Sequence, residues 1–407
     1  MMEYQTHELN NGIRLIHKKI SSPVAHLGVI INTGSRDEAD DEQGIAHFIE
    51  HMIFKGTQKR NSYQIISRLE DVGGDINAYT AKEETCIHAS FLTRYYDRAM
   101  ELFSDILFCS TFPEREIDKE REVIIEEIKS YKDSPSEQIF DDFEEMVYNG
   151  HTLGRNILGT NESLLSITRE KALGFILNKY FTNEMVICSV GTITFAEIKK
   201  LTQEFFGHIA ENRRNSLRAG FKGYKPANNR IKKDTFQSHC VIGNIAYNMS
   251  DKRRVGLFLL NNILGGPAMN SRLNMVLREK YGYAYNIESF YMPYSDTGLI
   301  DIYFGTDNGN LEKCLTIIMK ELEKLRNTKM GSRQLVRAKR QLTGQIAISA
   351  ENYASYLLTM GKSYMVFNKV DSFEETYRKI EAVTAEQIQD IANEVFNPEC
   401  LSFLIFE

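Results

Sequence analysis

The spacing of apolar residues in the first half of the chain follows two periods, and each period predicts a different element. Apolar residues that alternate or run together over short stretches predict strands at 13–16, 28–34, 88–92 and 185–190. Apolar residues that recur every three to four positions predict helices over 45–53, 65–72 and 99–107, and a charged helix over 114–132.

The second half of the chain repeats this order roughly 210 residues later. Its predicted elements are strands at 241–246 and 298–305, and helices at 255–264, 311–322 and from about 334. The intervening segment 211–233 is basic and rich in Asn and Gly, which is typical of a linker. We therefore predict an α+β fold of two related domains, 1–210 and 234–407, each a mainly antiparallel sheet packed with helices.

Composition limits what this protein can be. A chain of 407 residues is too long for one ordinary core, which agrees with two domains. No apolar run approaches the roughly 20 residues of a membrane span, and the N-terminus lacks the regions of a signal peptide. The six cysteines are scattered, and a net charge of −6 with dispersed Lys and Arg disfavours nucleic acid. We expect a soluble, cytoplasmic protein that binds neither membrane nor nucleic acid.

The predicted helix over 45–53 carries candidate chemistry beside its apolar face. His47, Glu50 and His51 form the sequence H-x-x-E-H, and their i, i+3 and i+4 spacing places the side chains on one side of the helix. Two imidazoles one turn apart can both reach a metal at roughly 2.0–2.1 Å, and a carboxylate beside them can take a proton from a bound water. The alternative is a surface helix that carries these residues by chance. A half-buried face of this kind, however, costs free energy unless something binds it.

A catalytic zinc site needs a third protein ligand and a water in addition to two histidines. The predicted helix over 114–132 supplies nearly all the candidates, which are Glu114, Glu116, Glu120, Glu122, Glu126 and Glu127. Glu120 and Glu127 share one face, whereas Glu126 points about 100° away from Glu127. A solvated glutamate face remains the alternative for most of these carboxylates.

The two predicted copies differ where this chemistry lies. Segment 255–264 corresponds to the histidine helix and contains neither His nor Glu. Segment 338–348 corresponds to the glutamate-rich helix and contains no carboxylate. Only the first copy is therefore predicted to carry out a reaction.

The motif H-x-x-E-H, followed by a glutamate in the run 120–127, resembles the insulinase (pitrilysin) metallopeptidases. The chain is most similar to their short two-domain members, such as the catalytic subunit of the mitochondrial processing peptidase and its bacterial relatives. The resemblance spans nearly the whole chain and includes the stretches 51–57, 74–80 and 154–159.

This resemblance assigns roles to the candidate residues. It implies that one Zn²⁺ ion per chain is held by His47, His51 and Glu127. It implies that Glu50 is the general base acting on the metal-bound water, and that Glu120 orients one of the histidines.

The resemblance also implies where a peptide substrate binds. In the family an edge strand matching 75–80 accepts the substrate as an added strand, so we expect Asn77, Ala78 and Tyr79 to contact its main chain. An ordinary buried strand is the alternative. Such recognition predicts loose specificity for substrate side chains.

A second stretch that resembles the family lies in the other half of the chain. Segment 278–285 matches the pattern R-E-x-x-G-x-x-Y, whose Arg and Tyr reach the substrate carbonyl in the family. The matching residues are Arg278 and Tyr285, which offer donors to an oxyanion. The chain lacks the long Gly-rich loop of the family's non-catalytic processing subunit, and this favours the active type.

We therefore expect a zinc metalloendopeptidase or oligopeptidase that hydrolyses unfolded or short peptides. The main alternative is a non-catalytic scaffold or partner subunit of a peptidase complex, which has no need of intact metal ligands. A metal-storing protein would not explain Arg278 and Tyr285. Long members of the family enclose the substrate with four such domains, so we expect this chain to dimerise, as a homodimer more readily than as a heterodimer.

Overall fold

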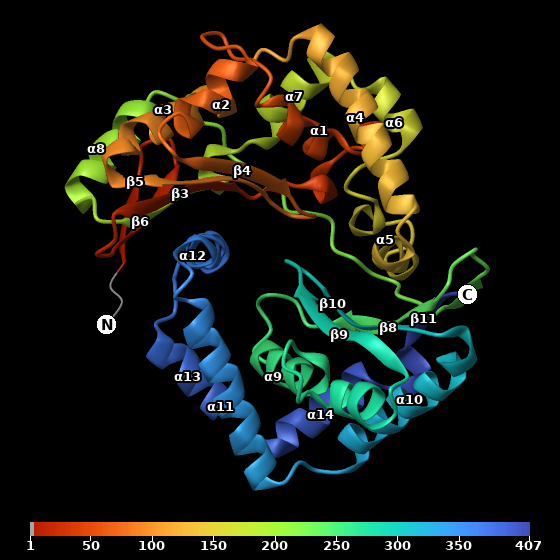
Figure 1. The fold of residues 1–407 in the computed structure, drawn as a ribbon. Coiled ribbons are helices and arrows are strands. Elements are labelled where there is room, and N and C mark those ends of the chain that lie inside the picture. The colour runs from red at the N-terminus through yellow and green to blue at the C-terminus, as the bar shows by residue number, and fades with distance from the viewer. Residues whose placement is uncertain (1–3) are drawn as a thin grey trace. The chain divides into compact units, whose positions relative to one another are not determined.

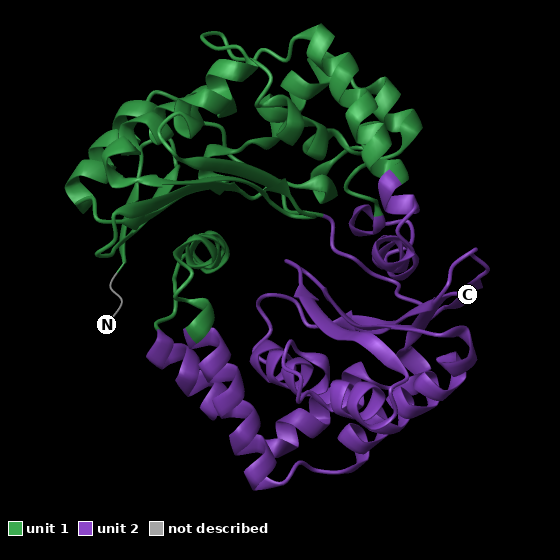
Figure 2. Ribbon diagram, viewed as in Figure 1, with its two compact units in different colours: residues 1–129, 155–218, 348–372 green, residues 130–154, 219–347, 373–407 purple. Residues whose placement is uncertain are grey.

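The computed structural model describes residues 4–407, which divide into two compact units (Figure 2). Unit 1 comprises the chain up to Lys129 with Arg155–Arg218 and Ile348–Ser372, and unit 2 comprises Ser130–Gly154, Ala219–Ala347 and Phe373–Glu407. Each unit therefore includes a segment from the opposite half of the chain. The predicted boundaries 1–210 and 234–407 do not contain such an exchange of segments. The predicted linker 211–233 is itself divided between the units.

Unit 1 contains a six-stranded sheet in the order β1-β2-β6-β3-β5-β4. Its strands are β1 (Gln5–Glu8), β2 (Arg14–Lys19), β3 (Val24–Ile31), β4 (Asp75–Thr80), β5 (Thr85–Leu92) and β6 (Met185–Gly191). The pair β2 and β6 is parallel, and all other neighbours are antiparallel. Among the described strands β4 pairs with β5 alone, so β4 lies at the edge of the sheet.

Helices cover both faces of this sheet (Figure 1). They are α1 (Ile45–Met52), α2 (Ser62–Glu70), α3 (Tyr96–Phe108), most of α4 (Glu114–Lys132), α6 (Asn161–Ser166), α7 (Arg169–Lys179), α8 (Phe195–Phe206) and α12 (Tyr353–Phe367). On one face, Val29 and Ile31 of β3 belong to the same core as α1 and α3. On the other face, Ile30 packs in a core with Leu357 and Met360 of α12. Because both faces are buried, β3 reads as a continuous apolar run.

Unit 2 contains a five-stranded sheet in the order β7-β11-β8-β10-β9. Its strands are β7 (Asn228–Ile231), β8 (Ser238–Ala246), β9 (Ala284–Pro293), β10 (Gly298–Thr306) and β11 (Ser402–Phe406). Its helices are α5 (Pro135–Val147), α9 (Arg254–Gly265), α10 (Leu311–Asn327), most of α11 (Ser332–Ser349), α13 (Phe373–Glu381) and α14 (Ala385–Val395). Only β7 and β11 are parallel among its pairs. The predicted α+β class with mainly antiparallel sheets is confirmed.

The two units correspond strand for strand, yet each takes one helix from the opposite half of the chain. Strand β1 is an additional edge strand of the first sheet. Without it, the strand order of each sheet begins with the single parallel pair, which is β2 with β6 in unit 1 and β7 with β11 in unit 2. Helix α5 follows α4 in the first half but packs on β8 and β11 of unit 2. Helix α12 follows α11 in the second half but packs on β3 and β6 of unit 1. A side chain at Gly361 of α12 would overlap Sγ of Cys188, so this helix lies close against β6.

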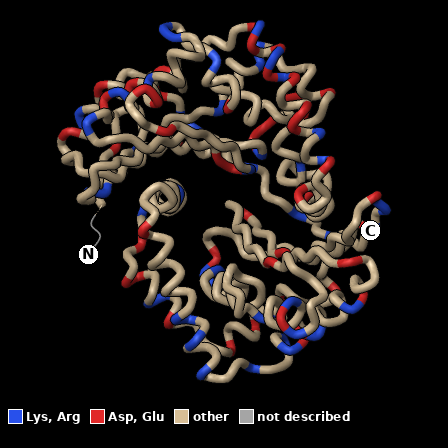
Figure 3. Tube along the Cα trace, in the orientation of Figure 1, with Lys and Arg blue, Asp and Glu red and all other residues tan. Residues whose placement is uncertain are grey.

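Charged residues of both signs are interspersed along the trace (Figure 3). Among residues 4–407, no helix combines the length and the apolar character that crossing a membrane requires.

Candidate metal centre

Helix α1 begins at a position that only glycine fits well. Gly44 precedes the helix with φ of 86°, a left-handed conformation, and a Cβ added there would lie 2.6 Å from the carbonyl oxygen of Leu158. The carboxylate of Glu38 accepts hydrogen bonds from the backbone amides of Gly44 and Ala46, both at 2.9 Å. These amides lack partners within the helix, so Glu38 caps α1 from outside it. Burial raises the pKa of Glu38 to about 8, although both amide donors lower it.

The apolar face of α1 fixes the direction of its polar face. Ile45, Phe48 and Ile49 are completely buried in the core of unit 1, as the helical spacing predicts. His47 is buried on a neighbouring face, while Glu50 and His51 are half-buried. The short helix is therefore held on one side and presents its motif residues on the other.

Helix α4 supplies the carboxylates that face this motif. Ile117, Ile124 and Ile128 bury one side of α4 in the core of unit 1. Glu127 lies on the side facing α1, whereas Glu126 is exposed and pairs with Lys129 at 2.6 Å. The predicted difference in direction between these two neighbours is thus present in the structure.

Three side chains converge between α1 and α4. The Nε2 atoms of His47 and His51 lie 3.9 Å and 3.8 Å from Oε2 of Glu127. Candidate ligand atoms of the three residues all lie within 4.8 Å of one another, and no other such group of His, Cys, Asp and Glu is found among the described residues. Ligands at tetrahedral zinc bonds of about 2.0–2.1 Å stand roughly 3.3 Å apart, so the cluster is slightly wider than a zinc site. Two imidazoles and one carboxylate are a common donor set of catalytic zinc.

Residues behind His51 determine which of its ring nitrogens faces the candidate metal position. Its Nδ1 lies 3.1 Å from Oε2 of Glu120, whose other oxygen is 2.6 Å from Nζ of Lys55. A carboxylate at Nδ1 favours the tautomer that leaves Nε2 free as a ligand. Burial alone would raise the pKa of Glu120, but the hydrogen bonds with His51 and Lys55 lower it, so it stays ionised. Lys55 was not among the predicted site residues, although it lies in the turn directly after α1 and follows His51 by four residues.

His47 and Glu50 are held in forms that suit a metal centre. Burial, with a smaller contribution from the neighbouring His51, lowers the pKa of His47 to about 4, so its imidazole is neutral. Its buried Nδ1 has no hydrogen-bond partner among the described residues. Burial raises the pKa of Glu50, against the opposing effect of a hydrogen bond from Thr80, and its Oε2 is buried without a partner. Buried polar groups left in this way fit a site completed by a bound group.

A network of buried charges fixes the loop that precedes α1. Nη1 of Arg36 donates to Oε1 of Glu83 at 2.6 Å. The carboxylate of Asp37 accepts from Arg214 and Arg218, which lie in the first part of the predicted linker. That part of the chain is therefore anchored on unit 1.

The stretch 154–159, noticed earlier only for its resemblance, supports the same loop. Arg155 donates to the carbonyl oxygens of Glu38 and Ala39 at 3.2 and 3.3 Å and pairs with Asp40. Nζ of Lys82 donates to the carbonyl oxygen of Arg155 at 2.7 Å. Sequence reasoning missed these supporting roles, because the acidic run before α1 signals a helix N-terminus without naming the capping residue.

The predicted substrate strand is the edge strand β4. Asn77 is exposed and donates to Asp75, and Ala78 is half-buried on the side that faces α1. The side chain of Tyr79 points to the opposite face of the sheet, where its hydroxyl donates to Glu84 at 3.0 Å. Only the main chain of Tyr79 is therefore available for a role at this edge.

Arg278 and Tyr285 belong to unit 2. Arg278 lies in the helical turn Asn274–Lys280, with its Nε 3.8 Å from Glu279, and Tyr285 lies near the start of β9. Both side chains are exposed, that of Tyr285 to 76%. They thus lie in a different unit from the cluster of His47, His51 and Glu127.

Comparison with protein families gives two matches. Residues 14–161 match the family described as insulinase (Peptidase family M16). Residues 166–342 match the family described as the Peptidase M16 inactive domain. The second match agrees with the absence of a His or Glu in segment 255–264.

Related sequences and structures cover the whole chain. An uncharacterized zinc protease, YmxG of Bacillus subtilis, is 33% identical over 97% of this chain and 96% of its own length. An uncharacterized zinc protease of Rickettsia felis is 33% identical over 93% and 91%. The crystal structure of a protease from Helicobacter pylori matches 100% of both chains with a TM-score of 0.93 at 21% identity. A second structure, titled as a peptidase M16 inactive domain from Pseudomonas fluorescens, has the same TM-score at 19% identity.

Proposed function

The chain belongs to the insulinase family, Peptidase family M16, and from this membership we propose that it is a zinc-dependent endopeptidase or oligopeptidase. Its substrates are unfolded or short peptides. The observation that carries the proposal is the convergence of His47, His51 and Glu127, with His51 oriented by Glu120. A scaffold protein would have no use for a ligand set supported in this way.

In the proposed hydrolysis, different residues of unit 1 bind the metal and transfer the proton. Zinc bound by His47, His51 and Glu127 would lower the pKa of a water to about 7 and polarise the substrate carbonyl. Glu50 takes the proton of the attacking water and then donates it to the leaving amine. Burial raises the pKa of Glu50, whereas a bound cation would favour its ionised form, which is the form that accepts the proton.

We further propose that the substrate lies along β4. The unpaired edge of this strand supports the assignment, because an extended peptide can add to it through main-chain hydrogen bonds at Asn77, Ala78 and Tyr79. Arg278 and Tyr285 would donate hydrogen bonds to the carbonyl oxygen as it gains negative charge. Their exposure in unit 2 supports this role, since neither side chain is buried in its own unit.

The proposed assembly is a homodimer. A metal centre open to bulk water loses the electrostatic advantage of a water-excluded site, and a second chain is one way to enclose it. Light scattering at the concentration of the activity assay tests this point. A fully active monomer of 46.8 kDa would refute the dimer but not the peptidase.

The function is tested by mass spectrometry of products from a peptide library. Cleavage should stop when a zinc chelator is added and return when zinc is restored. The Glu50→Gln variant should keep its zinc but lose activity by roughly 10²–10⁴-fold, as expected for a general acid–base residue. Near wild-type cleavage by this variant, or cleavage that the chelator does not affect, would refute the mechanism.

A further inference from the structure

One helix of unit 2 has a charge pattern that the proposed chemistry does not use. Helix α11 has 18 residues, of which four are Arg or Lys and none is Asp or Glu. This is unusual in a chain that has 55 acidic and 49 basic residues. Lys339 is its single buried residue and has a partner, since it donates to the carbonyl oxygen of Glu381.

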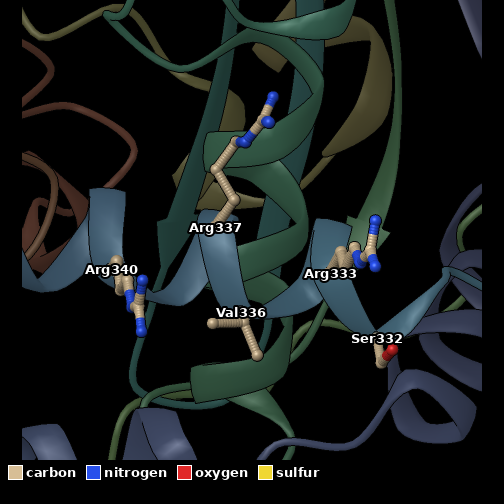
Figure 4. Close-up of a pocket in the computed structure, with 5 residues that line it drawn as sticks. All are labelled: Ser332, Arg333, Val336, Arg337 and Arg340. Carbon is tan, nitrogen blue, oxygen red and sulfur yellow. The ribbon is translucent and has the colours of Figure 1, made fainter.

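The three arginines of α11 form one exposed surface. Arg333, Arg337 and Arg340 follow at i, i+4 and i+7, which places them within about 60° of one another around the helix. With Val336 and Ser332 they line an open hollow of about 400 Å³ (Figure 4). Val336, which lies between them along the helix, is 45% exposed. We call these five residues the arginine face.

The arginine face is not neutralised by the rest of the protein. No ion pair of Arg333, Arg337 or Arg340 occurs among residues 4–407, although most other arginines of the chain have one. Like charges three and four residues apart repel each other on a helix. Arg333 also lies in the first turn of α11, where the helix dipole favours anions. The repulsion disfavours all three arginines and the dipole disfavours Arg333, and a bound carboxylate would offset both effects.

The dimensions of the face indicate the size of its ligand. From Arg333 to Arg340 the helix advances about 10 Å, the length of about three residues of an extended peptide. Guanidinium groups bind carboxylates through paired hydrogen bonds, and the exposed Val336 offers an apolar contact between them. The face therefore suits a short acidic segment that also carries an apolar side chain.

We propose that the arginine face is a binding site for acidic peptide segments, which selects the substrates of this protein. The proposal rests on the peptidase function for its biological use, but binding itself does not require cleavage. Acidic residues located away from the scissile bond would then lower KM and leave kcat unchanged, because the arginines do not take part in the reaction.

Binding is measured with the full-length, zinc-loaded Glu50→Gln protein, so that the probe is not hydrolysed. The probe is a fluorescein-labelled peptide with four glutamates and one leucine, and its partner has glutamine at each glutamate. We expect the acidic peptide to bind at least about 10-fold more tightly, with an affinity that falls as salt is added. The triple variant Arg333→Gln/Arg337→Gln/Arg340→Gln should bind both peptides alike.

Two control variants distinguish the effect of the arginine face from the effect of the protein's net charge. The variant Lys199→Gln/Lys200→Gln/Lys222→Gln removes three exposed charges elsewhere and should keep the preference for the acidic peptide. The variant Arg333→Lys/Arg337→Lys/Arg340→Lys keeps the charge of the face and should retain an intermediate preference. Equal melting temperatures confirm that α11 still folds in each variant. An equal loss of preference in the distant lysine variant would overturn the proposal.

Three further outcomes are decisive. If single-stranded oligouridylate competes as well as the acidic peptide at equal charge, the face is a general polyanion surface and the proposal is wrong. If wild-type protein cleaves the neutral peptide but shows no acidic preference in binding or KM, the proposal fails while the peptidase function stands. If it cleaves neither peptide but the acidic one still binds through α11, the peptidase function fails and the binding site stands.

Discussion

Helices α4 and α11 hold corresponding positions in the two halves of the chain but have opposite charge. Helix α4 carries six glutamates, one of which reaches the two histidines of α1. Helix α11 has four basic residues and no acidic one. Helix α9, the counterpart of α1, is apolar along most of its length and has seven buried residues. The same scaffold therefore carries a cluster of candidate metal ligands in one copy, and no such cluster is found in the described residues of the other.

This difference shows that the fold and the chemistry are specified by separate sets of residues. In both copies the isoleucines and leucines that face the sheet decide how the helices pack. The residues on the opposite helix faces are free to vary without loss of the core. Changing those polar faces should therefore alter the site in unit 1 with little effect on folding.

The largest effect is expected for Glu127→Gln. An amide is a much poorer zinc ligand than a carboxylate, so this variant should lose both zinc and activity. Its matched control is Glu126→Gln, because Glu126 is the adjacent residue of α4 but is exposed and paired with Lys129. Zinc content by plasma emission spectroscopy and peptide turnover should be near normal in the control. Equal zinc content in the two variants would contradict the choice of Glu127.

A smaller loss is expected for Arg278→Ala and Tyr285→Phe in unit 2. Removing one donor to an oxyanion typically lowers kcat by about 10²–10³-fold, and zinc content should not change. The measurement is kcat and KM on one peptide, with Lys280→Ala as a control in the same helical turn. Wild-type kinetics in both variants would mean that unit 2 contributes no group to the reaction.

Glu120→Gln should weaken the metal centre without abolishing it. The amide cannot hold the Nδ1 proton of His51 as a carboxylate does, and such partners typically contribute 10–100-fold to metal affinity. Competition with a chromogenic chelator measures this affinity. Glu122→Gln on the same helix is the control, and the argument for orientation of His51 fails if both variants bind zinc like the wild type.

A separate effect, on stability and not on activity, concerns a buried carboxylate of unit 2. Burial, and then the charge of Glu144, raise the pKa of Asp301, whose Oδ1 has no hydrogen-bond partner. The folded state thus holds a proton that the unfolded state releases above about pH 4. This group therefore opposes folding more strongly as the pH rises, by at most about 1.4 kcal/mol per pH unit.

Asp301→Asn removes that dependence. Its stability relative to the wild type should improve as the pH rises from about 5, as measured by urea unfolding at several pH values. Asp307→Asn, at an exposed position, serves as the control. A constant difference between Asp301→Asn and wild type across this range would show that Asp301 is ionised in the folded state.

Much of unit 1 and of its site could be predicted from local patterns. The helix over 45–53 has an apolar face that determines where His47, Glu50 and His51 point, so the motif alone indicates the site. The choice of Glu127 among six glutamates required the family resemblance, because helical spacing says only which carboxylates share a face. Glu38 and Arg155 could not be foreseen, since their roles depend on a loop conformation that leaves no periodic signal.

The positions of α5 and α12 could not be predicted for a different reason. The predicted boundaries 1–210 and 234–407 leave each helix with the half of the chain in which it occurs, because consecutive elements usually pack together. The apolar residues of α12, such as Leu357 and Met360, show that the helix is buried but not which sheet it covers. Only the assembled structure identifies the sheet.

The reciprocal positions of α5 and α12 also bear on how such a chain can arise. A protein of half this length, with one sheet and one exchanged helix, would be a domain-swapped dimer of identical subunits. Duplication and fusion of its gene would give one chain in which each half still completes the other. After fusion the two copies could diverge, so that one kept the metal ligands while the other lost them. If either half were then expressed alone, its sheet would lack the helix that the other half supplies, and one face of that sheet would be exposed.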